Sequence, residues 1–178
     1  MIQAWQVVNE RPGSAGYLSV STRTYLLPDG TRADWDIFGG ERSVAVVALT
    51  ANHDVVLARQ FRPGPGAVLD EIPGGYVEPR EDPLAAAARE LLEETGYAGD
   101  LSLCGSSWLA SACRTRRYVA VTTNARKVAD PEPQAGEFCE VVLKPLAAFR
   151  AHLRSGELTD VDLGYLALEH LGLLADLS

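Results

Sequence analysis

The sequence predicts an α/β protein in which a mixed β-sheet carries helices on both faces. Strand-like stretches come first, one capped helix follows, and strand and helix patterns alternate behind it, an order that is typical of this class. With 178 residues, 47% of them apolar, the chain can bury one good core. We therefore expect a single domain over residues 1–178, with a hairpin region in residues 1–42 and a core in residues 43–178.

The first half of the chain supplies the strands. Alternating apolar residues on both sides of the turn Pro28-Asp29-Gly30 predict an amino-terminal β-hairpin, and a second strand pair flanks the turn Asn52-His53-Asp54. With one further strand before the first helix, the expected strands of this half are residues 17–27, 33–38, 43–49, 55–61 and 68–72.

A helix is predicted over residues 83–95. Asp82 is a good N-cap, Pro83 is favoured at the first helical position, and Gly96 suits the left-handed residue that ends a helix. At 100° per residue, the apolar side chains of Leu84, Ala87, Ala88 and Leu91 fall on one side, and we expect Glu90, Glu93 and Glu94 on the other. The apolar side should pack, and the acidic side should face outwards or into a cleft. Behind this helix we expect strands over residues 117–122 and 138–144 and helices over residues 146–154 and 160–174.

The acidic side of this helix indicates metal chemistry. Like charges three and four residues apart disfavour an isolated helix by roughly 0.2–0.5 kcal/mol per pair, and no lysine lies among them. A hard cation such as Mg²⁺ or Mn²⁺, which prefers oxygen ligands, would turn that repulsion into a binding site. Arg89 is placed to brace a neighbouring carboxylate. The alternative is an acidic helix face that is merely solvated.

Charge and cysteine content exclude several classes of protein. The formal net charge of −8 and the pI near 4.9 argue against binding to nucleic acid or to an anionic membrane, because those partners need clustered Lys and Arg. The three cysteines lack the paired spacing of a zinc site or a disulfide framework, which favours a reducing, cytoplasmic location. We expect neither a secretory leader nor a membrane-spanning segment.

The segment from Gly75 to Tyr97 resembles the signature box of the Nudix hydrolases. It matches that box at every fixed position, namely Gly75, Glu81, Arg89, Glu90, Glu93, Glu94 and Gly96. Upstream residues 56–62 and 71–75, and downstream residues 136–141 and 156–160, are similar to the ADP-ribose pyrophosphatase branch of the family. The resemblance implies a Nudix-type α/β/α sandwich whose box forms a loop, a helix and a loop. It also implies a homodimer that the amino-terminal hairpin helps to build.

The resemblance also assigns metal ligands, residue by residue. It implies that Glu90 and Glu94 are the principal ligands of Mg²⁺ or Mn²⁺, that Glu93 is a further ligand, and that the Gly74 carbonyl completes the coordination. Glu93 and Arg89 are also counted among the catalytic residues. Glu81 either orients the metal ligands without binding the metal itself or has a purely structural role at the start of the helix.

Residues outside the box are candidates for substrate contacts. Strand alternation places Gln60 and Arg62 on one face, where Arg62 would contact phosphate or ribose, unless it is an ordinary surface cation. Glu71 is similar to a substrate-site acid of the family, with an ordinary edge-strand carboxylate as the alternative. Trp35 would stack on a base across a dimer interface, or else serve as a partly buried structural tryptophan.

The general base is expected in the long loop after the box. Glu137 is the leading candidate, because it ends that loop where ADP-ribose pyrophosphatases place an acid that orients water or metal. Glu132 and Glu140 compete for this role, and a solvated loop acid is the alternative.

The predicted function is metal-dependent hydrolysis of a nucleoside diphosphate linked to another moiety, with release of a nucleoside monophosphate. ADP-ribose or a similar nucleotide sugar is the first candidate, and dinucleotides and oxidised nucleoside triphosphates follow. Many ADP-ribose enzymes carry a Pro-Gly turn where this chain has residues 109–114. A substrate other than ADP-ribose is therefore an alternative, with Arg114, Arg116 and Arg117 recognising its second group. The other interpretation is that these three arginines only lie at the rim of a strand. The sequence also leaves room for a catalytically silent nucleotide-sensing domain or a metal-dependent diphosphate isomerase.

Overall fold

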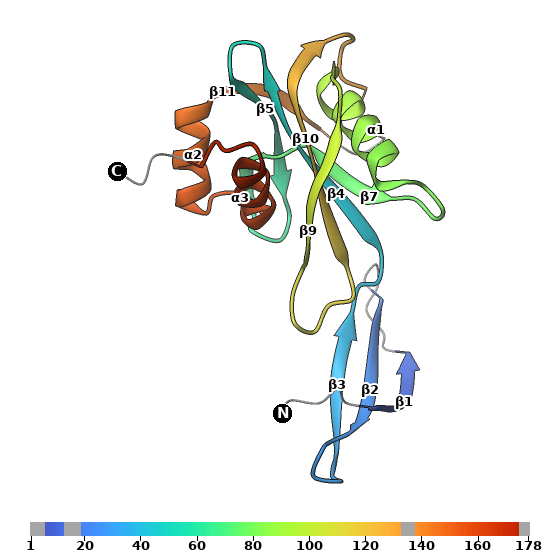
Figure 1. Cartoon of the computed structure of the whole chain (residues 1–178). Helices are drawn as coiled ribbons and strands as arrows, with labels where there is room; N and C mark the ends of the chain where they lie inside the picture. The colour runs from blue at the N-terminus through green and yellow to red at the C-terminus, as the bar shows by residue number, and fades with distance from the viewer. Residues whose placement is uncertain (1–5, 13–18, 133–137, 175–178) are drawn as a thin grey trace. The chain divides into compact units, whose positions relative to one another are not determined.

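The computed structural model describes residues 6–12, 19–132 and 138–174 (Figure 1). The chain forms two compact units. The amino-terminal unit comprises residues 1–41 with residues 108–116, and the larger unit comprises residues 42–107 with residues 117–178. Each unit has a sheet of its own.

The amino-terminal unit is built on an antiparallel sheet in the order β1-β2-β3. Its strands are β1 (Gln6–Pro12), β2 (Val20–Leu26) and β3 (Arg32–Phe38). The predicted hairpin is confirmed as β2 and β3, and β1 is an additional strand that the sequence did not suggest. Thr22 and Thr24 donate hydrogen bonds of 2.7 and 2.6 Å to the carboxylates directly opposite them on β3. These cross-strand pairs fix the register of the hairpin.

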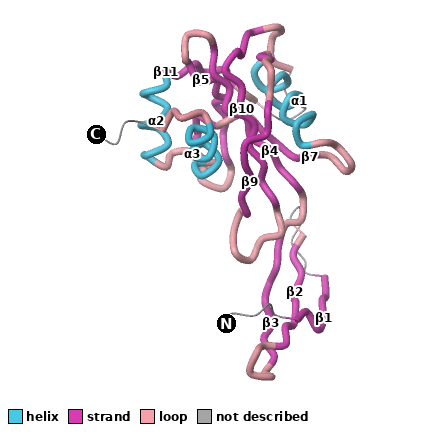
Figure 2. Tube along the Cα trace, in the orientation of Figure 1, coloured by secondary structure: helices cyan, strands magenta, loops and turns pink. Residues whose placement is uncertain are grey.

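The larger unit contains an eight-stranded sheet in the order β11-β5-β4-β10-β8, with β6 paired to β5, β7 to β4 and β9 to β10. Helix α1 lies on one face of this sheet and helices α2 and α3 lie on the other (Figures 1 and 2). The expected α/β class is confirmed. The elements are β4 (Arg42–Thr50), β5 (Asp54–Arg62), β6 (Ala67–Glu71), β7 (Gly74–Val77), α1 (Pro83–Thr95), β8 (Tyr97–Ala98), β9 (Ser102–Trp108), β10 (Arg116–Lys127), β11 (Glu140–Pro145), α2 (Leu146–Ser155) and α3 (Val161–His170).

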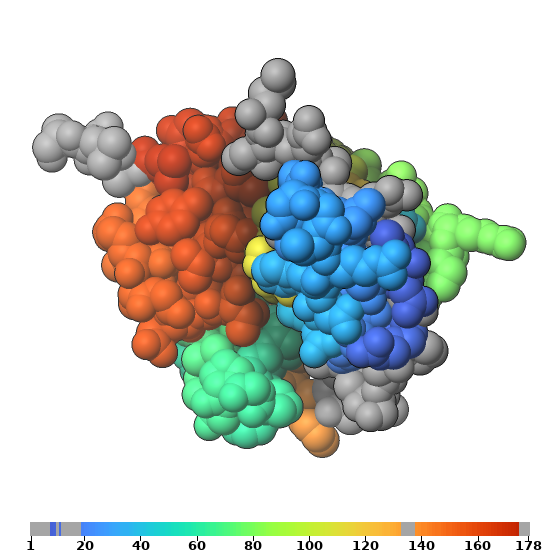
Figure 3. Space-filling view, turned by 90° about the horizontal axis from the view of Figure 1, so that it is seen from below, coloured from blue at the N-terminus to red at the C-terminus, as the bar shows by residue number. Residues whose placement is uncertain are grey.

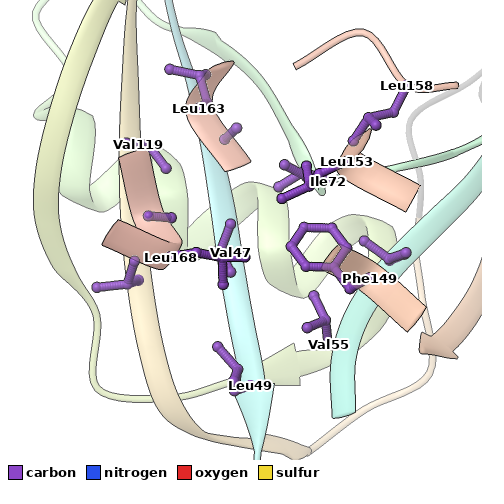
Figure 4. Packing of buried hydrophobic residues seen from close by; sticks show 14 residues of the cluster. Val47, Leu49, Val55, Ile72, Val119, Phe149, Leu153, Leu158, Leu163 and Leu168 are labelled. Atoms are coloured by element: carbon purple, nitrogen blue, oxygen red, sulfur yellow. The ribbon is translucent and has the colours of Figure 1, made fainter. Parts of the chain in front are cut away.

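Strand β4 is apolar on both faces because both faces are covered. Alternate residues Ala45, Val47 and Leu49 pack towards α2 and α3, around the fully buried ring of Phe149 (Figure 4). The intervening residues of β4 pack towards α1. Burying a side chain of the size of leucine or phenylalanine stabilises the fold by about 1.5–3 kcal/mol, so this strand fixes α1 against the sheet.

The expected helix boundaries hold where the sequence carries a cap. Helix α1 spans the predicted residues, whereas α3 ends at His170 instead of residue 174 because Gly172 turns the chain with φ of 67°. Strands β7, β8 and β9 were not expected, since they are short or contain glycine. Among the residues that the structure describes, no helix combines the length and the apolar character that crossing a bilayer requires.

The turn between β5 and β6 protrudes at the surface of the larger unit (Figure 3). Phe61 and Val68, which pair across the two strands, have 58% and 62% of their surface exposed. Val55 and Leu57 pack in the cluster with α2 and α3, whereas Val56 packs in the cluster with α1, so strand alternation places Phe61 on the α2 side.

Candidate functional site

Helix α1 is fixed at both ends. The Asp82 carboxylate accepts a 2.9 Å hydrogen bond from the amide of Leu84, and Pro83 occupies the first helical position. At the other end Gly96 adopts a left-handed conformation with φ of 71°, and the amide of Glu132 donates a 2.8 Å hydrogen bond to the carbonyl of Glu93. The acidic turn between these caps therefore has a defined position on the sheet.

Glu90 and Glu94 lie in the interface between α1 and the sheet. Only 8% of the surface of Glu90 and 5% of that of Glu94 is exposed. The expectation that these acids lie opposite the packed side is therefore wrong, and Ala86 takes the buried place predicted for Ala88, which is exposed. Two carboxylates are thus held in a site of low water content, where their charge interacts strongly with any cation.

Strand β7 makes room for the two carboxylates. The amide of Gly74 donates a 2.9 Å hydrogen bond to Glu94 Oε2. At Gly75 a Cβ atom would lie 2.5 Å from Glu90 Oε1, a separation that real Cβ atoms do not reach. A larger residue at this position would displace the Glu90 carboxylate, because the carboxylate occupies the space of a side chain.

Arg89 gathers the remaining acids of the helix. Its Nε and Nη2 atoms each lie 3.1 Å from an oxygen of Glu81, and Nη1 lies 2.7 Å from Glu90 Oε1 and 3.3 Å from Glu93 Oε2. Nη2 also donates to the carbonyl of Tyr76. The pKa of Glu81 is lowered, chiefly by the hydrogen bonds from Arg89. Arg89 therefore braces the box loop and the helix against each other, as the sequence indicated.

Two donors from β5 lie on the same side of the sheet as α1. Val56 packs in the cluster beneath α1, and strand alternation puts Gln60 and Arg62 on the same face as Val56. Gln60 Nε2 and Arg62 Nε are both buried, and neither has a hydrogen-bond partner among the described residues. Buried donors of this kind normally have a partner, so this strand end is suited to bind an anion.

Glu71 is fully buried at the end of β6. Its carboxylate accepts a 2.6 Å hydrogen bond from the hydroxyl of Thr159 and contacts from the amide of the same residue at 3.1 and 3.2 Å. Arg62 Nη2 lies 3.8 Å from Glu71 Oε2. Although β6 pairs with β5 alone, this carboxylate is not an exposed edge-strand group.

The model of the NUDIX domain matches residues 39–160 of the chain. The chain belongs to the Nudix family. It is 36% identical over 141 residues to the ADP-sugar pyrophosphatase of Mus musculus, which covers 68% of this chain and 64% of that protein. It is 39% identical over 91 residues to the ADP-ribose pyrophosphatase of Bacillus subtilis (strain 168), which covers 51% of this chain and 49% of that protein. The expected resemblance to this branch is confirmed, and the chain spans less than two thirds of the length of both relatives.

Among solved structures, the chain is similar to the crystal structure of ADP compounds hydrolase, with a TM-score of 0.80 and 19% identity. The similarity covers 98% of this chain and 99% of that one. At this identity the likeness concerns the fold, and it confirms the Nudix-type α/β/α sandwich.

The carboxylate oxygens of the Nudix box are of the kind that a hard cation prefers. Glu90 and Glu94 offer carboxylate oxygens one helical turn apart, beside the backbone of β7. Within the described ranges, however, no three His, Cys, Asp or Glu side chains are already gathered as a metal site, and Arg89 occupies one oxygen each of Glu90 and Glu93.

The three candidates for the general base, Glu137, Glu132 and Glu140, lie in different parts of the chain. Glu137, the leading one, lies outside the described residues. Glu132 has an exposed side chain next to the end of α1. Glu140 is paired in register with Arg59, on the face of the sheet opposite α1, so it lies away from the Nudix box.

Trp35, Arg114 and Arg116 belong to the amino-terminal unit, and Arg117 belongs to the larger unit. Trp35 is 47% exposed, so it is partly buried, and with Tyr25 it lines a concave pocket of about 370 Å³. Arg116 and Arg117 have different surroundings. Arg116 stacks over Trp108 at 4.9 Å, whereas Arg117 of the larger unit is buried between two aspartates.

Sequence reasoning gave no role to two residues at this Nudix site. Gln60 could have been found because strand alternation places it on the same face as Arg62. Thr159 could have been found because it lies in residues 156–160, a segment similar to the family. Nothing local in the sequence connects Thr159 to Glu71, which is 88 residues away.

Proposed function

We propose that the protein hydrolyses, with a divalent metal ion, the diphosphate of a nucleoside diphosphate linked to another moiety. ADP-ribose or a related ADP-sugar is the first candidate, and a nucleoside monophosphate is one product. The observation that carries the proposal is the pair of buried carboxylates, Glu90 and Glu94, held against the glycines of β7 in a Nudix box. The names of the relatives, ADP-sugar pyrophosphatase and ADP-ribose pyrophosphatase, support this choice of substrate class.

In this proposal Glu90, Glu94 and the Gly74 carbonyl hold Mg²⁺ or Mn²⁺, and Glu93 is a further ligand. When bound, the cation would neutralise charge on the phosphate oxygens and make a water molecule more acidic. Arg89 keeps Glu90 and Glu93 in position through its ion pairs. The burial of the two principal ligands keeps competing water away and strengthens their electrostatic effect.

The proposed substrate contacts depend on the face of its strand on which each side chain lies. Arg62 binds a phosphate group through its guanidinium, with Glu71 behind it. Trp35 stacks on a base across the interface of the homodimer, where its half-exposed ring lies beside Tyr25 in a concave pocket. Glu137 is the general base, on the similarity of its loop to that of the family.

Further properties belong to the same proposal. The chain acts as a single Nudix domain, forms a homodimer and works in the cytoplasm, where its three free cysteines would stay reduced. Neither a nucleic acid nor a membrane is a partner, in keeping with the acidic net charge of −8.

The test is a panel of nucleotides incubated with the protein and Mg²⁺ or Mn²⁺. The panel contains ADP-ribose, other nucleotide sugars, dinucleotides and oxidised nucleoside triphosphates, and the products are separated by chromatography. We expect ADP-ribose or an ADP-sugar to be cleaved fastest, with release of AMP only when metal is present. The proposal fails if no member is cleaved. Calorimetric binding of a nucleotide without any cleavage would instead indicate a sensor.

A further inference from the structure

Thr159, in the loop between α2 and α3, contacts Glu71 at the end of β6. Thr159 contacts the Glu71 carboxylate with both its hydroxyl and its amide, so both carboxylate oxygens accept hydrogen bonds from one residue. Thr159 is itself exposed, while Glu71 has none of its surface exposed. Thr159 therefore covers the carboxylate and fixes its orientation.

Thr159 is held in this place by the residues that follow it. The neighbouring Asp160 pairs at 2.7 Å with Arg117, which is buried at the start of β10. Arg117 also pairs with Asp162, in the first turn of α3, and its Nη2 contacts the Ser107 hydroxyl at 3.2 Å. The loop is thus anchored to β9 and β10, and its contact with Glu71 is not a chance approach of a mobile segment.

The Glu71 carboxylate in turn faces Arg62. The separation of 3.8 Å is an ion pair longer than a hydrogen bond, so it attracts the guanidinium without using its donors fully. Arg62 Nε is buried and makes no hydrogen bond to any described residue. A fixed carboxylate behind Arg62 therefore sets where the guanidinium lies and leaves donors for an anion.

We propose that Thr159 is a positioning residue for the phosphate-binding Arg62 and acts on it through Glu71. This inference rests on the proposed function, in which Arg62 binds a phosphate group of the substrate. Thr159 touches neither substrate nor metal in this scheme. Its hydroxyl keeps the Glu71 carboxylate in the one orientation that holds Arg62 towards the α1 side of the sheet.

The kinetic experiment compares a variant without the Thr159 hydroxyl with a variant that keeps it. Thr159→Val removes the hydroxyl, and Thr159→Ser keeps it. We expect Thr159→Val to lower kcat/KM about tenfold, the loss typical of a hydrogen bond to a charged group, and Thr159→Ser to restore it. Thr31→Val is the matched control, because it removes a 2.7 Å threonine–carboxylate bond in the turn between β2 and β3. It should leave kcat/KM unchanged.

A double-mutant cycle separates positioning from a general structural role. If Thr159 acts through Arg62, the loss in Arg62→Gln/Thr159→Val should equal that of Arg62→Gln alone. Additive losses, within about a factor of two, would overturn the proposal, as would a failure of serine to restore activity. Melting temperatures of all variants check that the fold is kept.

A second measurement does not depend on turnover. In ¹⁵N-labelled protein the Nε–H signal of Arg62 is assigned by its loss in Arg62→Lys. We expect this signal to shift or broaden in Thr159→Val and to stay in place in Thr159→Ser and Thr31→Val. An unchanged signal in Thr159→Val would refute the positioning role. If the wild type cleaves no nucleotide, the proposed function falls, and the signal still decides whether Thr159 positions Arg62.

Discussion

Two adjacent glycines of β7 are required for different physical reasons. At Gly75 an added Cβ atom would meet the side-chain oxygen of Glu90 at 2.5 Å, which is the end of a flexible side chain. At Gly74 it would meet the backbone oxygen of Val44 at 2.2 Å, on the neighbouring strand, which cannot move alone. Gly75 therefore leaves space for the Glu90 carboxylate, and Gly74 allows β7 to lie close to the backbone of β4.

The variants Gly75→Ala and Gly74→Ala should accordingly separate activity from stability. We expect Gly75→Ala to displace the Glu90 carboxylate, so that hydrolysis falls strongly while the melting temperature changes little. Gly74→Ala should destabilise the fold by about 1–3 kcal/mol, as overpacking does. Thermal unfolding and hydrolysis rates of both variants test this, and equal stability losses in the two would contradict it.

Glu94→Gln should remove a metal ligand without disturbing the fold. The amide oxygen of glutamine can still accept the hydrogen bond from Gly74, so the packing of α1 is preserved. We expect kcat to fall by more than the roughly 10–100-fold typical of residues that only orient a metal ligand. The check is turnover with saturating Mg²⁺, and wild-type activity in this variant would refute the assignment.

Glu137→Gln tests the proposed general base. Removing a general base typically costs about 10²–10⁴-fold in rate, and the affinity for Mn²⁺, measured by electron paramagnetic resonance, should stay close to that of the wild type. Glu132→Gln is the matched control in the same stretch of chain. A silent Glu137→Gln together with a slow Glu132→Gln would reverse the two roles.

The sequence identified the box acids but misjudged their surroundings. The expectation set Glu90 and Glu94 opposite the packed side, although at 100° per residue Glu94 falls about 20° from the buried Ala87. The helical pattern therefore already placed this acid beside the packed side, and the charge of the side chains was given too much weight. What the helix alone could not predict is how β7 accommodates them, where Gly75 leaves space and Gly74 offers an amide.

At the scale of elements, local signals predicted what local contacts determine. The caps of α1 gave both of its ends, because Asp82 and Gly96 act within one turn. Strand β8 has two residues and β9 contains Gly105, so neither shows a strand pattern, and both depend on pairing with β10. The contact between Thr159 and Glu71 could not be predicted either, because it joins two elements far apart in the sequence.

Asp70 should make the stability of the sheet depend on pH. Hydrogen bonds from Arg59, with further contributions from Lys144, lower the pKa of Asp70 below its ordinary value of 3.8 and join β5, β6 and β11. The ionised carboxylate therefore stabilises the fold above pH 3.8, and this contribution is lost as the pH falls through the lowered pKa.

Asp70→Asn should thus cost about 1 kcal/mol at neutral pH, a value kept small by the exposure of Arg59. The difference from the wild type should shrink below pH 3.8. Urea unfolding of both proteins at a series of pH values measures it. A difference that is the same at neutral and acidic pH would show that charge is not its cause.

At the scale of the whole molecule, residues far apart in the sequence share a unit. Residues 108–116 join the amino-terminal strands through the bridge between Phe38 and Cys113 and through hydrogen bonds of the Phe38 backbone to Ala112 and Arg114. The order of strand and helix patterns predicted the α/β class, and composition predicted the acidic character of the protein. Neither could predict that residues 108–116 belong to the amino-terminal unit, because contacts between segments far apart in the sequence leave no local pattern.

Metal binding should raise the stability of the folded protein. A ligand that binds only the native state stabilises it by about 2.7 kcal/mol at a concentration a hundredfold above its Kd. We expect Mg²⁺ and Mn²⁺ to raise the Tm of the wild type in a saturable way and to have little effect on Glu94→Gln. An equal shift in both proteins would place the cation elsewhere.

The last turn of α1 is completed by residues from much later in the chain. Besides the bond from Glu132 to the carbonyl of Glu93, the amides of Val128 and Ala129 bond to the carbonyl of Gly96. A helix of 13 residues is marginal in water without such support. An excised peptide carrying only the box would therefore lack an ordered last helical turn, and grafting the motif into another scaffold would require residues 128–132, which follow β10, as well.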